Sequence, residues 1–222
     1  VFYDSDGNNT VSFSGQTARM DMLSEMTSYL KTANTSGGSN QLDAQTLLSM
    51  YDNSYEGWSD ANLVGNGKQL KNKTAIEDFG VQAQFEAWMT EAAAATPPTE
   101  DGYYLQAASG HEWTQLIEKG LMSACFASQM TANYLANVIT DNNTNAVAGK
   151  YYTEMEHHWD EAYGYFTDTS NYGEANPADA DTPFGAERFW GKYANKTLNT
   201  ILGSADAISL AFRTGRSAIS SG

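Results

Sequence analysis

The stretch from Ser109 to Thr140 reads SGHEWTQLIEKGLMSACFASQMTANYLANVIT, and its apolar residues recur every three or four positions. This period places them on one face of an α-helix. The residues of that face are Trp113, Ile117, Leu121, Ala124, Ser128, Leu135 and Val138. Ser109 followed by Glu112 has the spacing of a capping box, which marks a helix start. The stretch therefore predicts one long helix over residues 110–140.

The same period recurs along most of the chain and predicts further helices at 15–33, 75–95 and 146–166. A shorter helical segment is predicted around 43–51, and helical spacing continues over 189–219 with a break near Gly203, after a start signal at Thr182-Pro183. No run alternates with the period of two that strands require. The sequence predicts an all-α fold, with helices packed in bundles in a single domain over 1–222.

Apolar faces also predict which side chains form the core. Trp88, Trp113, Phe85 and Leu121 lie on the apolar stripes of their helices and should be largely buried. The single cysteine, Cys125, falls on the same period as Leu121 and should pack as a small apolar side chain.

Composition excludes two classes of partner. The chain has 12 Lys plus Arg and 27 Asp plus Glu, a net charge of −15, so nucleic acid should be repelled. No purely apolar run is longer than Ala92–Ala95, which is far short of a transmembrane segment. The many amide, hydroxyl and tyrosine side chains, with one cysteine, are typical of an exported protein. The start at Val1 and the apolar period that reaches Gly222 lead us to expect a processed chain that lacks a C-terminal part.

The predicted helix 146–166 carries the best candidate for a chemical site. Each residue advances by about 100° around a helix, which puts its apolar side chains in one sector together with His158. These apolar residues are Val147, Tyr151, Met155, Ala162 and Tyr165. Glu154 and Glu161 lie within about 60° of His158, whereas Glu156 and Asp160 are expected to face water.

Carboxylates and imidazoles on a buried stripe are costly unless they are paired or bind a metal. Glu154 and His157 lie one turn apart, as do His158 and Glu161, so either pair could reach one cation. His111, in the first turn of the helix predicted at 110–140, could add a ligand because the helix dipole favours its neutral form. The predicted metal ligands are His158, Glu161, Glu154, His157 and His111. The alternative is a buried polar network of Glu154, His158, Glu161 and Tyr165 that binds nothing.

Several segments resemble the imelysin-like proteins and a group of exported bacterial lipoproteins related to them. The site segment Glu156–Phe166 reads EHHWDEAYGYF and is similar to their His-x-x-Glu motif. Further similar segments are Ser14–Leu23, Tyr29–Asn34, Gly67–Lys73 and Trp190–Tyr193. The resemblance implies a fold of two packed helical bundles and export to the periplasm, the outer membrane as a lipoprotein, or the exterior.

The resemblance also implies a role in metal uptake, usually of iron, with His158 and Glu161 in the two motif positions. The family usually has glycine two residues before the histidine, where this chain has Glu156, so zinc and copper stay open beside iron. Three functions follow as hypotheses. The first is a non-catalytic metal-binding protein, the second a cell-surface structural or recognition protein with an envelope partner, and the third a peptidase. Zinc peptidases show His-Glu-x-x-His, whereas this chain has adjacent histidines.

Overall fold

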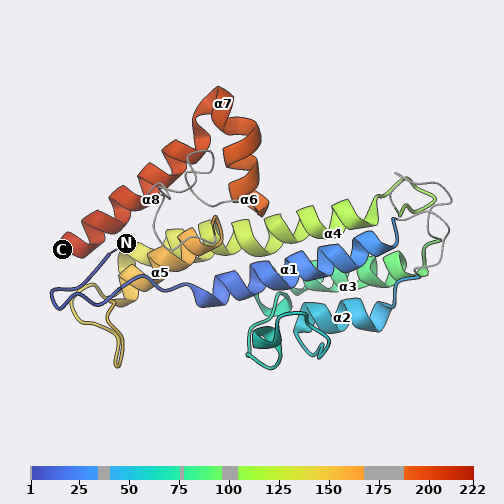
Figure 1. The fold of residues 1–222 in the computed structure, drawn as a ribbon, viewed down its shortest axis with the longest axis horizontal. Helices are drawn as coiled ribbons and strands as arrows, with labels where there is room; N and C mark the ends of the chain where they lie inside the picture. Colours follow the sequence, from blue (N-terminus) through green and yellow to red (C-terminus); the bar gives the residue numbers. More distant parts are fainter. Residues whose placement is uncertain (1, 35–40, 76–77, 97–104, 168–187) are drawn as a thin grey trace. The chain divides into compact units, whose positions relative to one another are not determined.

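The computed structural model describes residues 2–34, 41–75, 78–96, 105–167 and 188–222, and these residues are helical with connecting turns (Figure 1). Within these ranges no strand forms, and the only extended pairing consists of isolated β-bridges such as Ala146 with Thr153. The predicted all-α fold is confirmed. The helix start expected at Thr182-Pro183 lies outside the described residues.

The chain divides into two compact units. One comprises residues 18–128 and contains most of α1. Its elements are α1 (Ser14–Thr32), α2 (Ala44–Asp52), η1 (Ala61–Leu63), η2 (Lys71–Lys73), α3 (Phe79–Ala94), α4 (Trp113–Leu121) and the π-helical η3 (Met122–Ala127). The other comprises residues 1–17 and 129–222. Its elements are η4 (Gln129–Leu135), η5 (Val138–Thr140), α5 (Glu154–Gly164), α6 (Phe189–Lys192), η6 (Tyr193–Leu198), α7 (Asn199–Leu202) and α8 (Ser204–Ser221).

The core of the 18–128 unit confirms most of the predicted burial. Phe85, Trp113 and Leu121 are buried. Trp88 is only half-buried, with its ring against the edge of Phe85 at 5.1 Å between centroids. Cys125 is fully buried, and burial raises the pKa of its thiol to about 12, so the thiol stays protonated at neutral pH.

Two helix starts lie later than predicted. The helix predicted over 75–95 begins at Phe79, because the Asp78 carboxylate accepts a hydrogen bond from the Gly80 N–H at 2.9 Å. The helix predicted over 110–140 begins at Trp113, because Gly110 has a φ of 86° and the chain turns before Glu112. The predicted Ser109–Glu112 capping box does not form, since Glu112 is itself the N-cap and makes no side-chain capping hydrogen bond. From Met122 to Leu135 this helix is largely π-helical. The predicted helix over 15–33 agrees with α1.

The helix that carries the site begins later than predicted, and this changes the side chains that it buries. Residues 146–153 form a turn closed by the Ala146–Thr153 bridge, and a capping box between Thr153 and Glu156 starts α5. Val147 and Tyr151 are therefore exposed, which corrects the buried stripe predicted for this segment.

Helix α8 packs against α5. Gly203, with a φ of 59°, produces the break predicted before this helix. The Phe212 ring of α8 contacts three aromatic rings, those of Trp159, Tyr163 and Phe166.

None of the described helices is long and apolar enough to cross a lipid bilayer.

We expect Gly215→Ala to lower the free energy of unfolding, although alanine usually stabilises a helix interior by about 1 kcal/mol relative to glycine. A Cβ at position 215 would lie 2.1 Å from Trp159 Cζ2. The indole cannot move away freely, because its N–H donates to the Phe212 carbonyl at 2.9 Å. Overpacking of this kind costs about 1–3 kcal/mol. Chemical denaturation should show this loss, while the exposed Thr214→Ala should stay within about 0.5 kcal/mol of wild type; a stabilised Gly215→Ala would contradict this packing.

Candidate metal centre

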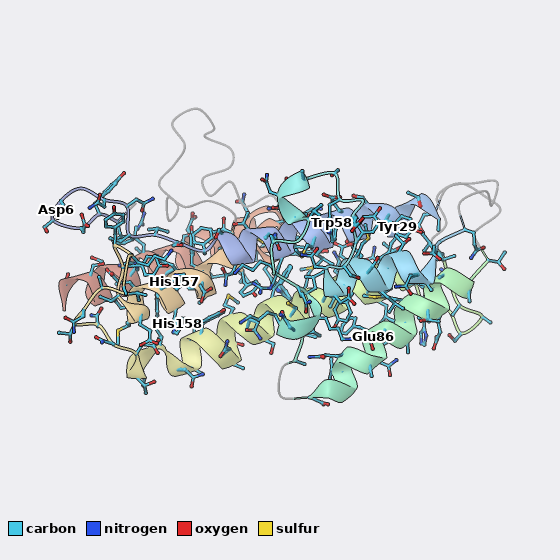
Figure 2. The ribbon with its side chains drawn as sticks, turned by 90° about the horizontal axis from the view of Figure 1, so that it is seen from below. Asp6, Tyr29, Trp58, Glu86, His157 and His158 are labelled. Carbon is cyan, nitrogen blue, oxygen red and sulfur yellow. The ribbon has the colours of Figure 1, made fainter. Side chains whose placement is uncertain are left out.

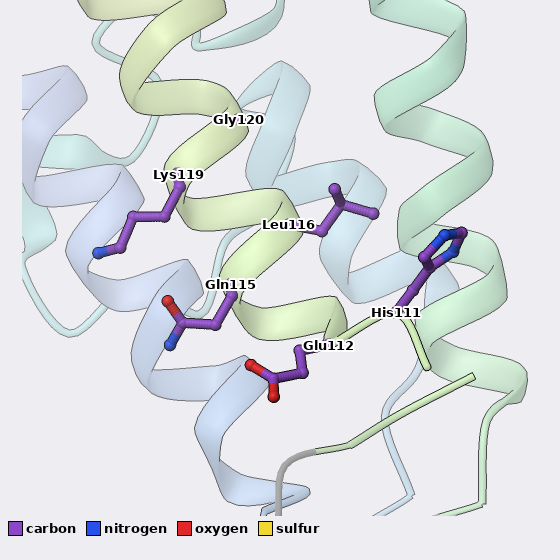
Figure 3. Close-up of a pocket in the computed structure, with 6 residues that line it drawn as sticks. All are labelled: His111, Glu112, Gln115, Leu116, Lys119 and Gly120. Atoms are coloured by element: carbon purple, nitrogen blue, oxygen red, sulfur yellow. The ribbon is translucent and has the colours of Figure 1, made fainter. Parts of the chain in front are cut away.

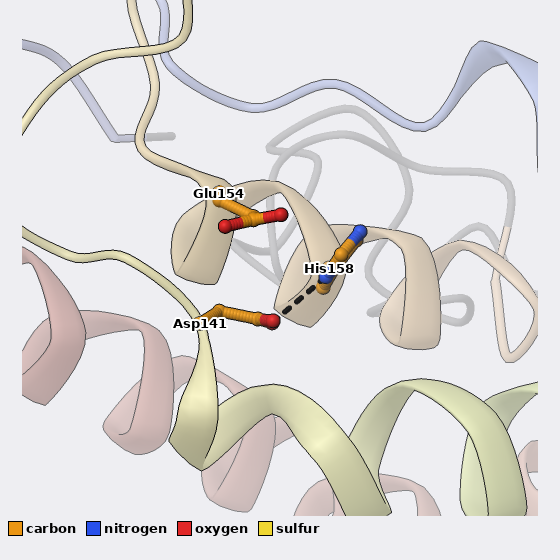
Figure 4. Close-up of side chains that lie close together, drawn as sticks. All are labelled: Asp141, Glu154 and His158. Carbon is orange, nitrogen blue, oxygen red and sulfur yellow. Dashed lines mark hydrogen bonds and ion pairs between the residues drawn. The ribbon is translucent and has the colours of Figure 1, made fainter.

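Three side chains that could hold a metal ion come together at the start of α5. Asp141, Glu154 and His158 each offer one ligand atom, and these atoms lie within 4.8 Å of one another (Figure 4). Among the residues that the structure describes, no other group of three histidine, cysteine or acidic side chains meets this condition. His158 and Glu154 were predicted ligands, whereas Asp141 was not.

Local structure explains how these three residues meet. Asp141 follows the 3₁₀ turn η5, and Glu154 is the first residue of α5, one turn before His158. Two contacts join the two segments: Asn142 N–H donates to Glu154 Oε2 at 3.3 Å, and Met155 N–H donates to the Asn142 carbonyl at 3.2 Å. The cluster therefore combines a pair spaced by four residues on one helix with a carboxylate from the preceding turn.

The geometry is close to that of a metal centre. His158 Nδ1 and Asp141 Oδ2 lie 2.7 Å apart, at hydrogen-bonding distance. Two ligands bound to one ion at about 2.1 Å lie about 3 Å apart when they are at right angles, so a small outward movement would admit the ion. The His158 side chain is 34% exposed and Glu154 is exposed, so an ion can reach the cluster from solvent. The Tyr134 ring packs near the imidazole at 5.7 Å.

The other predicted ligands of α5 form a separate cluster around His157. Figure 2 shows His157 and His158 on the same helix. Glu161 Oε1 lies 3.9 Å from His157 Nε2 and accepts a hydrogen bond from Gln16 Nε2 at 2.9 Å. The His157 ring stacks on Tyr152, with 4.4 Å between centroids. The structure thus places Glu161 beside His157, whereas the motif of the imelysin-like proteins that this segment resembles pairs the glutamate with the histidine at position 158.

Burial lowers the pKa of His157 below its ordinary value of 6.5, and this effect exceeds the opposing charge of Glu161. The unfolded chain then binds a proton more readily than the folded protein. The contribution of His157 to stability is present above about pH 6.5 and is lost as the pH falls below that value. Ring-proton NMR should give a His157 pKa below 6.5. In His157→Gln the free energy of unfolding should change less with pH below about pH 6.5. A His157 pKa at or above 6.5 would contradict the assignment.

The remaining predicted ligand, His111, lies in the 18–128 unit, where it precedes α4 and is exposed. Its ring meets the edge of Trp113 at 5.9 Å. It lines an open pocket together with Glu112 and residues along α4 (Figure 3). These are Glu112, Gln115, Leu116, Lys119 and Gly120. No histidine, cysteine or acidic side chain of the described residues completes a metal-binding group with His111.

The face of α5 that was expected to be solvent-exposed is buried. Asp160 is fully buried and Glu156 is 8% exposed, because both carboxylates pair with the fully buried Arg216 of α8. Arg216 Nε donates to Asp160 Oδ1 at 2.9 Å, and Arg216 Nη1 donates to Glu156 Oε1 at 2.6 Å. The guanidinium also donates to Thr10 Oγ1 at 2.8 Å. The prediction that Glu156 and Asp160 face water was wrong, because a cation from a distant helix compensates for their burial.

Two residues of these clusters were missed, although the sequence contains a signal for each. Asp141 directly precedes the Asn142-Asn143 turn that leads into the segment of the site helix. Arg216 lies four residues after Phe212, on the apolar period of the last helix, where an unpaired cation would be costly. A charged residue on an apolar stripe predicts a buried partner, but the period alone does not identify the partner.

Comparison with known proteins places the chain in one family. The model of the family described as "Domain of unknown function (DUF4856)" matches residues 2–84 and 80–222. No curated protein and no solved structure matches the chain. Because the two matched segments together extend from residue 2 to residue 222, the chain belongs to this family of domains of unknown function.

Proposed function

We propose that this protein is an exported, non-catalytic metal-binding protein that holds one ion, preferentially iron, at Asp141, Glu154 and His158. The single observation that carries the proposal is the meeting of these three ligand atoms within 4.8 Å. Two carboxylates and an imidazole form a donor set that suits ferrous iron and zinc better than ions that prefer thiolate or thioether ligands. The resemblance to imelysin-like proteins supports iron over zinc, and supports export and a role in metal uptake.

The arrangement of the three ligands favours reversible binding of the ion over its permanent retention as a structural metal. Three protein ligands leave coordination positions for water or for a group that arrives with the ion. The partly exposed imidazole and the exposed Glu154 give solvent access to the ion. Before the ion binds, the hydrogen bond between His158 Nδ1 and Asp141 Oδ2 holds these two side chains near each other, and the ion would replace the proton between them.

Binding to the native state alone must raise the melting temperature as the ligand concentration rises. We expect ferrous iron at 100 times its dissociation constant to stabilise the folded protein by about 2.7 kcal/mol. Anaerobic thermal melting with iron, with zinc and with a chelator measures this shift. A midpoint that is the same in chelator and in every metal would contradict the proposal and favour the purely structural network.

A further inference from the structure

We propose that the C-terminal turn of α8 is a positioning element for the metal centre, and that Asn143 is the residue through which it acts. This inference rests on the proposed metal site and adds a role for residues that would not touch the ion. The residues concerned are Asn143 and Thr153 near the ligands, and Arg216, Ile219 and Ser220 on α8. All of them lie in the unit formed by residues 1–17 and 129–222.

The first connection from α8 runs through its arginine. Arg216 Nη1 donates to Glu156 Oε1 at 2.6 Å, and Ser220 Oγ donates to the same oxygen at 2.9 Å. The other carboxylate oxygen of Glu156 accepts the Thr153 N–H at 2.9 Å and so closes the capping box of α5. A single carboxylate therefore links α8 to the residue before Glu154, the first ligand on the helix.

The second connection runs through Asn143, in the segment that carries Asp141. Asn143 Nδ2 donates to the Ile219 carbonyl at 2.7 Å, and Asn143 Oδ1 accepts the Thr153 hydroxyl at 2.9 Å. The same hydroxyl oxygen accepts the Glu156 N–H at 3.2 Å. Asn143 is two residues from Asp141, so this side chain fixes the spacing between the segments that carry Asp141 and Glu154.

The two connections converge on Thr153 and fix the relative positions of ligands from two segments. Groups that orient metal ligands without touching the ion typically contribute 10- to 100-fold to metal affinity. Coupling of this kind is reciprocal, so an ion held at the site should in turn stabilise the docking of α8. Removing the Arg216 cation would leave two carboxylates without their partner and would strongly destabilise this unit, so Asn143 is the informative position for a test.

The test compares Asn143→Ala with Asn137→Ala in the full chain, using ferrous iron without oxygen as the probe. Asn137 is an exposed residue of the same unit, and its side-chain amide donates to the Asn133 carbonyl at 2.6 Å. We expect Asn143→Ala to weaken iron affinity by about 10-fold or more, with Asn137→Ala unchanged. Circular dichroism in chelator checks that both variants are folded.

Hydrogen exchange supplies a readout that a purely structural role would not change. Iron should slow exchange in Ser204–Ser221 of the wild type, and this protection should be reduced in Asn143→Ala. Equal iron affinity in the wild type and a folded Asn143→Ala, or exchange in α8 that iron does not alter, would overturn the inference while leaving the metal site intact. A wild type that binds no iron would instead refute the proposed function, and the inference with it.

Discussion

Asp160→Ala is expected to destabilise the protein by about 3–5 kcal/mol, the loss typical of removing one partner of a buried ion pair. Asp160 and Arg216 are both fully buried, and their side chains meet at 2.9 Å. Removing the Asp160 carboxylate takes away an anionic partner of the Arg216 guanidinium, which water cannot reach because it is fully buried. Chemical denaturation should show the loss, whereas Glu91→Ala, at an exposed position of α3, should stay within about 0.5 kcal/mol of wild type.

A double-mutant cycle separates the pair from its surroundings. Arg216→Met combined with Asp160→Leu removes the two charges of this pair and retains apolar volume, which often restores stability in buried ion pairs. Glu156 loses its contact with Arg216 in every variant that lacks the arginine, so this loss is common to Arg216→Met and the double variant. We expect the double variant to be more stable than either single variant, with a coupling free energy of about 0.5–3 kcal/mol. Additive losses would show that the two side chains act independently and would contradict a stabilising interaction between Asp160 and Arg216.

His158→Ala should weaken iron binding by more than about 100-fold, because this change removes a ligand and even outer groups contribute 10- to 100-fold. Stability in chelator should change little, since His158 is partly exposed and alanine is a good helix former. Isothermal titration with iron measures the affinity. His111→Ala is the matched control, because His111 is an exposed histidine of the other unit and should leave the affinity unchanged.

Glu161→Gln distinguishes the cluster of Asp141, Glu154 and His158 from a site built on the His-x-x-Glu motif of the imelysin-like proteins. The structure pairs Glu161 with His157 and Gln16, so this variant should retain iron affinity within a small factor. A loss as large as that of His158→Ala would mean that the His-x-x-Glu pair of the motif binds the ion, and that Asp141 and Glu154 form only a structural contact.

The helices themselves could be predicted because apolar period and helix-stop signals are local. The start of α5 could not be placed from the apolar period, since Val147 and Tyr151 fit the period although they lie in a turn. The local signal that decides the start is the Thr153-x-x-Glu156 capping box. The π-helical segment Met122–Leu135 has no counterpart in the apolar pattern.

The candidate site was predicted only in part, because two of its ligands lie on one helix and the third comes from another segment. The sequence predicted Glu154 and His158 in one sector of the helix, but it paired Glu154 with His157 and His158 with Glu161, whereas the structure brings Glu154 and His158 together one turn apart. Asp141 reaches them from another segment through the turn at Asn142, and that contact depends on tertiary structure. The burial of Asp160 likewise depends on Arg216, 56 residues away in the chain.

The most direct measurement is anomalous diffraction at the iron absorption edge from crystals of the iron-loaded protein. We expect one anomalous peak at bonding distance from the His158 imidazole and from carboxylate oxygens of Asp141 and Glu154. A peak between His157 and Glu161, or the absence of any peak at the start of α5, would contradict it.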